Sequence, residues 1–156
     1  MAVPIIRPAR PAEAADLSEL ALRSKGHWGY DSDFLEACRD VLTLSPGDVD
    51  AGALFVAELD GISAGFYRLG GGPPVAELED LWVDPPTMGR GVGAALLAHA
   101  AERARERGCT AVLVESDPHA EGFYRSQGAQ RVGERTSSVD ESRRLPLLRL
   151  ELEGAV

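Results

Sequence analysis

Cysteine and histidine, which bind metals or form disulfides, are scarce in this 156-residue sequence, with two cysteines and three histidines. Aromatic residues make up only 6% of it. Cys38 and Cys109 lie far apart and neither belongs to a CxxC pair, so the spacing predicts neither a zinc site nor a disulfide framework. His27, His99 and His119 form no HxxxH pair. We therefore expect no metal centre.

Long apolar runs are missing as well. No segment reaches the ~20 consecutive apolar residues of a membrane span. Residues 1–16 lack the apolar core of a signal peptide. The expected compartment is the cytoplasm, and no membrane partner is expected.

Basic residues are outnumbered, since 16 Lys+Arg against 25 Asp+Glu give a formal net charge of −9. Nucleic acids and anionic membranes are both recognised by clustered basic side chains, so neither is an expected partner. The charge is compatible with a cationic small molecule such as an amine, but net charge bears more directly on solubility than on function. With 44% hydrophobic residues and the length of one domain, residues 1–156 are expected to form a single globular domain.

Glycine, proline and capping residues divide the chain into short strands and helices. Asp60-Gly61 between two apolar runs predicts a β-hairpin, and Gly108 stands where a left-handed helix cap belongs. The expected strands are Val3–Arg7, Leu54–Leu59, Ile62–Leu69, Val75–Val83, Ala111–Glu115, Arg131–Glu134 and Leu147–Leu152. The expected helices are Pro11 to about Ser24, Asp33–Leu42 with an Asp33/Glu36 capping box, about Gly93 to Arg107, and Pro118–Gln127. Ser45–Gly52 and Gly70–Pro74 are expected to be loops. This order predicts a mixed α/β sheet with helices on its faces.

The most informative segment is Leu81–Leu97, LWVDPPTMGRGVGAALL, in which three glycines lead from a strand into a helix. Glycine allows positive φ and close approach of a ligand to the backbone. The first N–H groups of a helix have no internal acceptor and attract phosphate. The segment lacks the lysine that a P-loop requires, and it matches only half of a dinucleotide-binding GxGxxG motif. The glycines could also simply permit a tight turn.

The context of this loop resembles the coenzyme A loop of the GNAT-type N-acetyltransferase superfamily, whose pattern is (Gln/Arg)-x-x-Gly-x-(Gly/Ala). The resemblance implies that the loop holds the pyrophosphate of acetyl-CoA, and that the backbone of Leu81, Trp82 and Val83 pairs with the pantetheine arm. Met88 departs from the pattern, because a polar residue is usual there. The loop residues so implied are Met88, Gly89, Arg90, Gly91, Val92, Gly93 and Ala94.

A second segment, Asp117–Ala129, resembles the family's Asn-x-x-Ala-x-x-Phe-Tyr-x-x-x-Gly-(Phe/Ala). It departs at Asp117, where asparagine is usual. The resemblance implies cofactor contacts from Asp117, Ala120, Phe123 and Tyr124. It also implies a mostly antiparallel sheet of about seven strands with about four helices, with acetyl-CoA held between the strands Val75–Val83 and Ala111–Glu115.

Acetyl transfer to an amine needs a base, because a free amine is protonated at neutral pH. Glu79 is the candidate base, with Glu77 and Asp80 as alternatives on the same strand. Alternation places Glu77 and Glu79 on one face and Asp80 on the other. Tyr124 is the candidate acid, in the position to which the resemblance assigns proton donation to the coenzyme A thiolate.

The acceptor is expected near residues 25–30, with Glu77 and Asp80 as further candidates. Lys25, His27, Trp28 and Tyr30 offer charge and aromatic surface in a connector. Trp28 could instead fill the core. Arg143 and Arg144 could bind an acceptor carboxylate, or be solvated charges.

The predicted function is acetyl transfer from acetyl-CoA to a primary amine of a small molecule or peptide by direct attack. The alternatives are a non-catalytic acyl-CoA-binding or partner-binding module and a binder of nucleotide phosphates. Members of the family are often dimers, so a homodimer is a possible assembly. Polyamines, aminoglycosides, amino acids and protein N-termini all stay open as acceptors.

Overall fold

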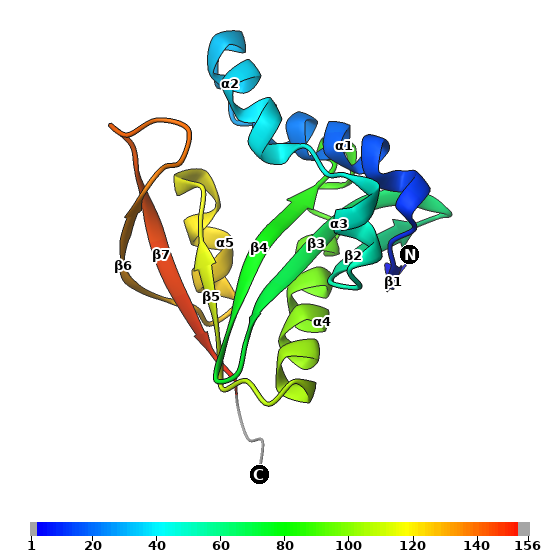
Figure 1. Cartoon of the computed structure of the whole chain (residues 1–156), viewed down its shortest axis with the longest axis vertical. Coiled ribbons are helices and arrows are strands. Elements are labelled where there is room, and N and C mark those ends of the chain that lie inside the picture. Colours follow the sequence, from blue (N-terminus) through cyan, green and yellow to red (C-terminus); the bar gives the residue numbers. More distant parts are fainter. Residues whose placement is uncertain (1–2, 153–156) are drawn as a thin grey trace. The chain divides into compact units, whose positions relative to one another are not determined.

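A computed structural model describes residues 3–152, and these contain seven strands and five α-helices (Figure 1). The strand order is β1-β2-β3-β4-β5-β7-β6. Strands β4 and β5 are parallel, and the pairs β1–β2, β2–β3, β5–β7 and β6–β7 are antiparallel. The strands are β1 Ile5–Pro8, β2 Leu54–Leu59, β3 Ile62–Gly72, β4 Val75–Val83, β5 Ala111–Glu115, β6 Gln130–Thr136 and β7 Arg144–Glu151. The helices are α1 Ala14–Gly26, α2 Ser32–Leu42, α3 Pro46–Asp50, α4 Val92–Glu106 and α5 Glu121–Ser126, with 3₁₀ turns at Pro11–Glu13, Pro85–Thr87 and Pro118–Ala120. The predicted mixed, mostly antiparallel seven-stranded fold is confirmed.

The chain divides into two compact units. Unit 1 contains Met1–Arg68 and Asp80–His99, and unit 2 contains Leu69–Glu79 and Ala100–Val156. Each unit is described below by itself. The single-domain assignment of residues 1–156 stays a prediction.

Three local expectations were wrong. The α2 cap is Asp31 and not Asp33, since the Asp31 carboxylate accepts the Phe34 N–H at 2.8 Å. The expected loop Ser45–Gly52 contains α3, which begins with a Ser45/Asp48 capping box. The expected glycine turn after Leu69 is part of β3, which continues to Gly72.

Unit 1 has apolar side chains on both faces of β2 and β3. Val56 and Phe66 join the cluster formed with α1, which includes Leu17 and Leu20. The alternate residues Phe55 and Tyr67 stack at 5.3 Å between ring centroids and lie against His99 of α4. Because alternate residues of a strand point to opposite faces, α1 and the first part of α4 cover opposite faces of these strands (Figure 1).

Gly65 of β3 allows the close packing that fixes the start of α4. A Cβ at this position would lie 2.6 Å from the Trp82 carbonyl oxygen, 3.1 Å from Leu96 Cδ1 and 3.2 Å from Val92 Cγ1. A side chain here would therefore meet both backbone and core. The absence of one lets β3 and β4 support the helix that follows the glycine loop.

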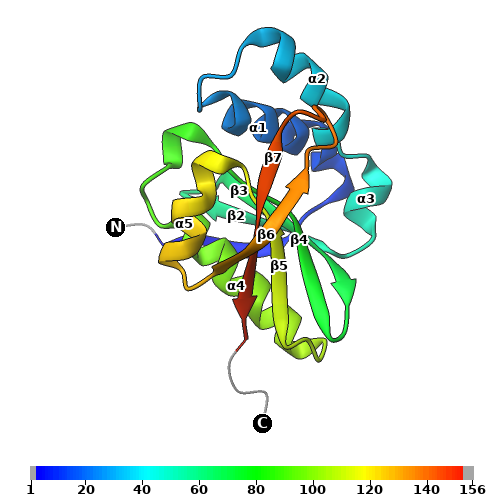
Figure 2. The same cartoon turned by 90° about the vertical axis from the view of Figure 1, so that its left-hand side faces the viewer.

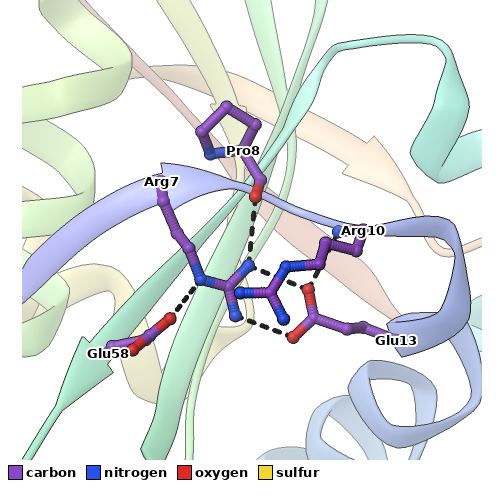
Figure 3. A network of polar contacts seen from close by, with 5 residues as sticks. All are labelled: Arg7, Pro8, Arg10, Glu13 and Glu58. Carbon is purple, nitrogen blue, oxygen red and sulfur yellow. Dashed lines mark hydrogen bonds and ion pairs between the residues drawn. The ribbon is translucent and has the colours of Figure 1, made fainter. Parts of the chain in front are cut away.

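An ion-pair network joins β1 to β2 and to the turn before α1 (Figure 3). Arg7 donates from both terminal nitrogens to Glu13, at 2.8 Å each, and from Nε to Glu58. The Glu13 carboxylate also accepts the Arg10 N–H at 2.9 Å. The hydrogen bonds from Arg7 hold the pKa of Glu13 below its usual value of 4.5.

Replacing Glu13 by glutamine is expected to lower the stability of unit 1 at neutral pH by about 1–2 kcal/mol, because a charge-assisted bidentate contact is lost. Since the folded-state pKa of Glu13 is depressed, its contribution is present above the unfolded value of 4.5 and is lost as the pH falls through the folded value. Thermal melts from pH 7 to pH 3 measure the difference in Tm, which should shrink toward the acid end. Glu36→Gln removes an exposed partner of Arg39 and should change Tm little. A Glu13→Gln deficit that stays constant down to pH 3 contradicts the assignment.

Unit 2 is built on the adjacent strands β5, β7 and β6 together with the first part of β4 (Figure 2). The parallel ladder between β4 and β5 runs from Val75–Ala111 to Leu78–Val114. Helix α5 packs against β6, and Gly128 ends it with φ of +100°.

No helix within residues 3–152 combines the length and the apolar character needed to cross a membrane.

Candidate active site

The glycine loop of unit 1 joins the 3₁₀ turn Pro85–Thr87 to α4 through two glycines with positive φ. Gly89 and Gly91 have φ of +80° and +81°, and a Cβ on either would meet no atom within 4 Å. The first helical hydrogen bond runs from the Ala95 N–H to the Gly91 carbonyl at 3.1 Å. The N–H groups of Val92, Gly93 and Ala94 precede this bond, so they have no acceptor within the helix. Gly89 and Gly91 are thus required by their backbone conformation and not by crowding.

The loop is anchored on its strand side and exposed at its tip. The Thr87 hydroxyl donates to the Asp84 carbonyl at 2.8 Å and contacts the Ala64 carbonyl at 3.2 Å, and the Met88 N–H donates to the Pro85 carbonyl. Arg90 is half-exposed and lies 3.7 Å from Asp60 of the β2–β3 hairpin. A weak surface pair of this kind leaves the Arg90 guanidinium able to turn toward a phosphate.

Asp80 is held by two donors on the α1 face of unit 1. Its carboxylate accepts from Arg68 Nε at 2.9 Å and from Trp82 Nε1 at 3.1 Å, and its side chain is 10% exposed. Trp82 packs against the α1 core cluster. Asp80 therefore fixes the side chain of Trp82, next to the Leu81–Val83 backbone.

Glu77 and Glu79 lie in unit 2 and differ in their surroundings. Glu77 pairs with Arg135 of β6 at 3.3 Å, and Arg135 also lies 3.8 Å from Glu115. Glu79 follows Leu78, the last residue of β4 paired with β5 in unit 2. Its carboxylate lies against Gly70 of β3, at the place where a Cβ of that residue would be.

The Asp117–Ala129 segment of unit 2 buries Tyr124 and uses Asp117 as a cap. The Asp117 carboxylate accepts the His119 N–H at 2.9 Å and lies 2.9 Å from His119 Nδ1. Tyr124 is 6% exposed and its ring meets Phe123 edge-on, at 5.1 Å between centroids. The cap starts the turn that contains Ala120 and leads into α5.

The four residues expected to meet the acceptor form two pairs at the end of α1. Lys25 is 8% exposed, and its Nζ lies 4.9 Å from the centroid of the Tyr30 ring. His27 and Trp28 make an edge contact at 4.9 Å. The buried ammonium of Lys25 is thus stabilised by an aromatic face. Binding of an acceptor by these residues stays a prediction.

Three residues of these clusters were missed by sequence reasoning, namely Arg68, Arg135 and Gly70. Arg135 and Glu77 are 58 positions apart, so no local pattern indicates their contact. Arg68 and Asp80 are 12 positions apart, on the consecutive and neighbouring strands β3 and β4. Opposite charges on two such strands are a sequence signal that could have predicted this contact.

No cluster of three or more metal-ligating side chains was found among residues 3–152.

Comparisons with known proteins agree with this architecture. The Acetyltransferase (GNAT) family model matches residues 15–129. An aminoglycoside N(6′)-acetyltransferase type 1 from Stenotrophomonas maltophilia is 31% identical, over 96% of this chain and 95% of that protein. A glucosamine 6-phosphate N-acetyltransferase from Oryza sativa subsp. japonica is 35% identical, over 57% of this chain and 53% of that protein.

A solved GCN5-related N-acetyltransferase from Rhodopseudomonas palustris shares the fold, with a TM-score of 0.81 and 24% identity over 97% of this chain and 98% of that one. The family model covers more than half of the chain, and the bacterial relative covers nearly all of it. The chain belongs to the GNAT family of acetyltransferases.

Proposed function

We propose that this protein transfers an acetyl group from acetyl-CoA to a primary amine by direct attack on the thioester. The observation that carries the proposal is the glycine loop, in which two positive-φ glycines precede the first-turn N–H groups of α4. That arrangement attracts a phosphate by hydrogen bonding and by the helix dipole. Membership of an acetyltransferase family makes the pyrophosphate of acetyl-CoA the natural anion.

The cofactor contacts proposed in unit 1 come from the loop Met88–Ala94 and from the strand before it. Backbone groups bind the pyrophosphate, so the departure at Met88 costs one side-chain contact only. The backbone of Leu81, Trp82 and Val83 pairs with the pantetheine arm. In unit 2, Ala120 and Phe123 line the cofactor, and Asp117 acts through its cap of the turn that leads to Tyr124.

Glu79 is the proposed base, acting directly or through water on the ammonium form of the acceptor. Its place in β4, two residues before the Leu81–Val83 backbone that we propose pairs with the pantetheine arm, supports this choice. Asp80 is held by Arg68 and Trp82, and Glu77 is paired with Arg135.

Tyr124 is the proposed acid, which protonates the departing thiolate. Its ring is buried and packs edge-on against Phe123, so the position of the hydroxyl is restricted. A thiol has a pKa of ~8.5, so protonation makes the coenzyme a better leaving group at neutral pH.

The proposed acceptor class is an amino sugar or another small basic amine. The names of two relatives specify an aminoglycoside and glucosamine 6-phosphate as acceptors. The net charge of −9 favours a cationic acceptor over an anionic one. The acceptors of these relatives and the net charge make kanamycin, glucosamine 6-phosphate and spermidine the first three amines to test.

Thermal shift with acetyl-CoA and with ATP, followed by a thiol-release assay with these amines and an amino-terminal peptide, tests the proposal. Stabilisation by acetyl-CoA together with thiol release that depends on an amine is the expected result. Stabilisation without release on any amine favours the alternative, an acyl-CoA-binding or partner-binding module. Stabilisation by ATP but not by acetyl-CoA favours a nucleotide-phosphate binder.

A further inference from the structure

We propose that Gly70 is a positioning residue for the Glu79 carboxylate, which rests in the space left by the missing side chain of that glycine. The inference rests on the proposed role of Glu79 as the base and deepens it. It makes Gly70 a determinant of turnover although glycine has no chemistry of its own.

The contact is close and involves the carboxylate itself. A Cβ built on Gly70 would lie 2.4 Å from Glu79 Oε1, 2.7 Å from Cδ and 3.2 Å from Oε2. An ordinary van der Waals contact begins at 3.4 Å. All three nearest atoms belong to the end of the Glu79 side chain, so this carboxylate lies directly over the Gly70 backbone.

The glycine is not required by backbone conformation or by crowding of the core. Gly70 lies within β3, and its φ is outside the left-handed region that favours glycine. Gly65 on the same strand is different, because there the nearest atom is the Trp82 carbonyl oxygen in the backbone. At Gly70 the atom that has to move is at the end of a flexible side chain, so an added methyl displaces the carboxylate and leaves the strand in place.

The displacement is large enough to matter for proton transfer. The oxygen has to move by about 1 Å to reach an ordinary contact distance. A catalytic group misplaced by about 1 Å can lose up to roughly 100-fold in rate, because proton transfer requires hydrogen-bond geometry. The proposed cofactor contacts come from Met88–Ala94, Leu81–Val83 and the Asp117–Ala129 segment and not from this carboxylate, so we expect the effect in kcat.

Gly70→Ala is therefore expected to lower kcat roughly 10- to 100-fold, with the KM for acetyl-CoA and the Tm nearly unchanged. The matched control is Gly72→Ala, two residues further along the same strand. A Cβ at Gly72 meets nothing within 4 Å, and its φ is also outside the left-handed region. Gly72→Ala should retain the wild-type kcat with the amine that gives the most thiol release.

A double-mutant cycle with Glu79→Gln separates positioning from a general structural effect. If Gly70 acts through Glu79, adding Gly70→Ala to Glu79→Gln should change kcat by less than twofold. An equal further loss in the Glu79→Gln background overturns the inference, as does a Gly70→Ala kcat equal to that of Gly72→Ala.

The outcomes also separate this inference from the proposed function. Amine-dependent release that Glu79→Gln abolishes and Gly70→Ala spares supports the base and rejects the positioning role. Wild-type turnover in Glu79→Gln rejects both. Carbon-13 NMR of glutamate-labelled protein gives a readout that needs no acceptor, with the Glu79 carboxyl signal assigned by its loss in Glu79→Gln. That signal should shift in Gly70→Ala and not in Gly72→Ala, and an unchanged signal overturns the inference even if no amine turns over.

Discussion

Tyr124→Phe is expected to lower kcat roughly 100-fold or more while the Kd for acetyl-CoA stays within about twofold of wild type. General acid catalysis by a positioned side chain contributes typically 10²–10⁴-fold. The substitution removes the hydroxyl and keeps the ring, which is buried and packed edge-on against Phe123. Thiol-release kinetics give kcat, and calorimetry gives the Kd.

Tyr67→Phe is the matched control for this variant. Tyr67 is also buried, and its hydroxyl lies 2.6 Å from His99 Nδ1. Loss of that hydroxyl should lower the stability by about 0.5–1.5 kcal/mol, because one part-buried hydrogen bond is lost, and should leave kcat unchanged. Equal turnover in Tyr124→Phe and wild type would remove Tyr124 from the mechanism.

Gly91→Val is expected to weaken binding of acetyl-CoA by roughly 10- to 100-fold. Valine at a φ of +81° is strained by about 1–3 kcal/mol, so the loop has to leave its conformation or store that strain. A Cβ at Gly91 meets no protein atom within 4 Å, and the side chain would instead occupy the space through which a phosphate approaches the α4 N–H groups. Calorimetric titration with acetyl-CoA measures the loss.

Gly52→Val separates strain from lost binding. Gly52 has φ of +78° and also has nothing within 4 Å of a built Cβ, but it lies in the connection between α3 and β2. Both variants should lose similar stability in thermal melts, and only Gly91→Val should lose affinity for acetyl-CoA. An unchanged Kd in Gly91→Val would rule out the loop as the phosphate site.

Local features of the fold were predictable because their causes lie within a few residues. The Asp60-Gly61 hairpin forms with positive φ at both residues, as its sequence predicts. The bounds of β2, β4 and β5 agree with the expected strands. The α3 helix was missed although its signal is local, since a Ser-Pro-x-Asp start is a helix beginning that we interpreted as a loop.

The backbone conformation of the glycine loop was predictable from the sequence, and the surroundings of the β4 acids were predictable only in part. Sequence alternation separated Asp80 from Glu77 and Glu79, and resemblance to a family indicated the loop and Tyr124. Sequence reasoning named Glu79 as the candidate base and kept Glu77 and Asp80 as alternatives, because it did not show the contacts of the three carboxylates with Arg68, Arg135 and Gly70. These partners come from other strands, and strand order and register bring them within reach.

The sequence by itself determined the backbone of the glycine loop, the hairpin and the helix ends, since each depends on the φ preferences and hydrogen bonds of residues at most four positions apart. Only the tertiary structure decided which charged side chains pair with each other and that the Glu79 carboxylate lies against the backbone of Gly70. Ion pairs and van der Waals contacts act over a few ångströms in space, and separation along the chain places no limit on them. Arg135 beside Glu77, and the Glu79 carboxylate on Gly70, are therefore properties of the folded chain alone.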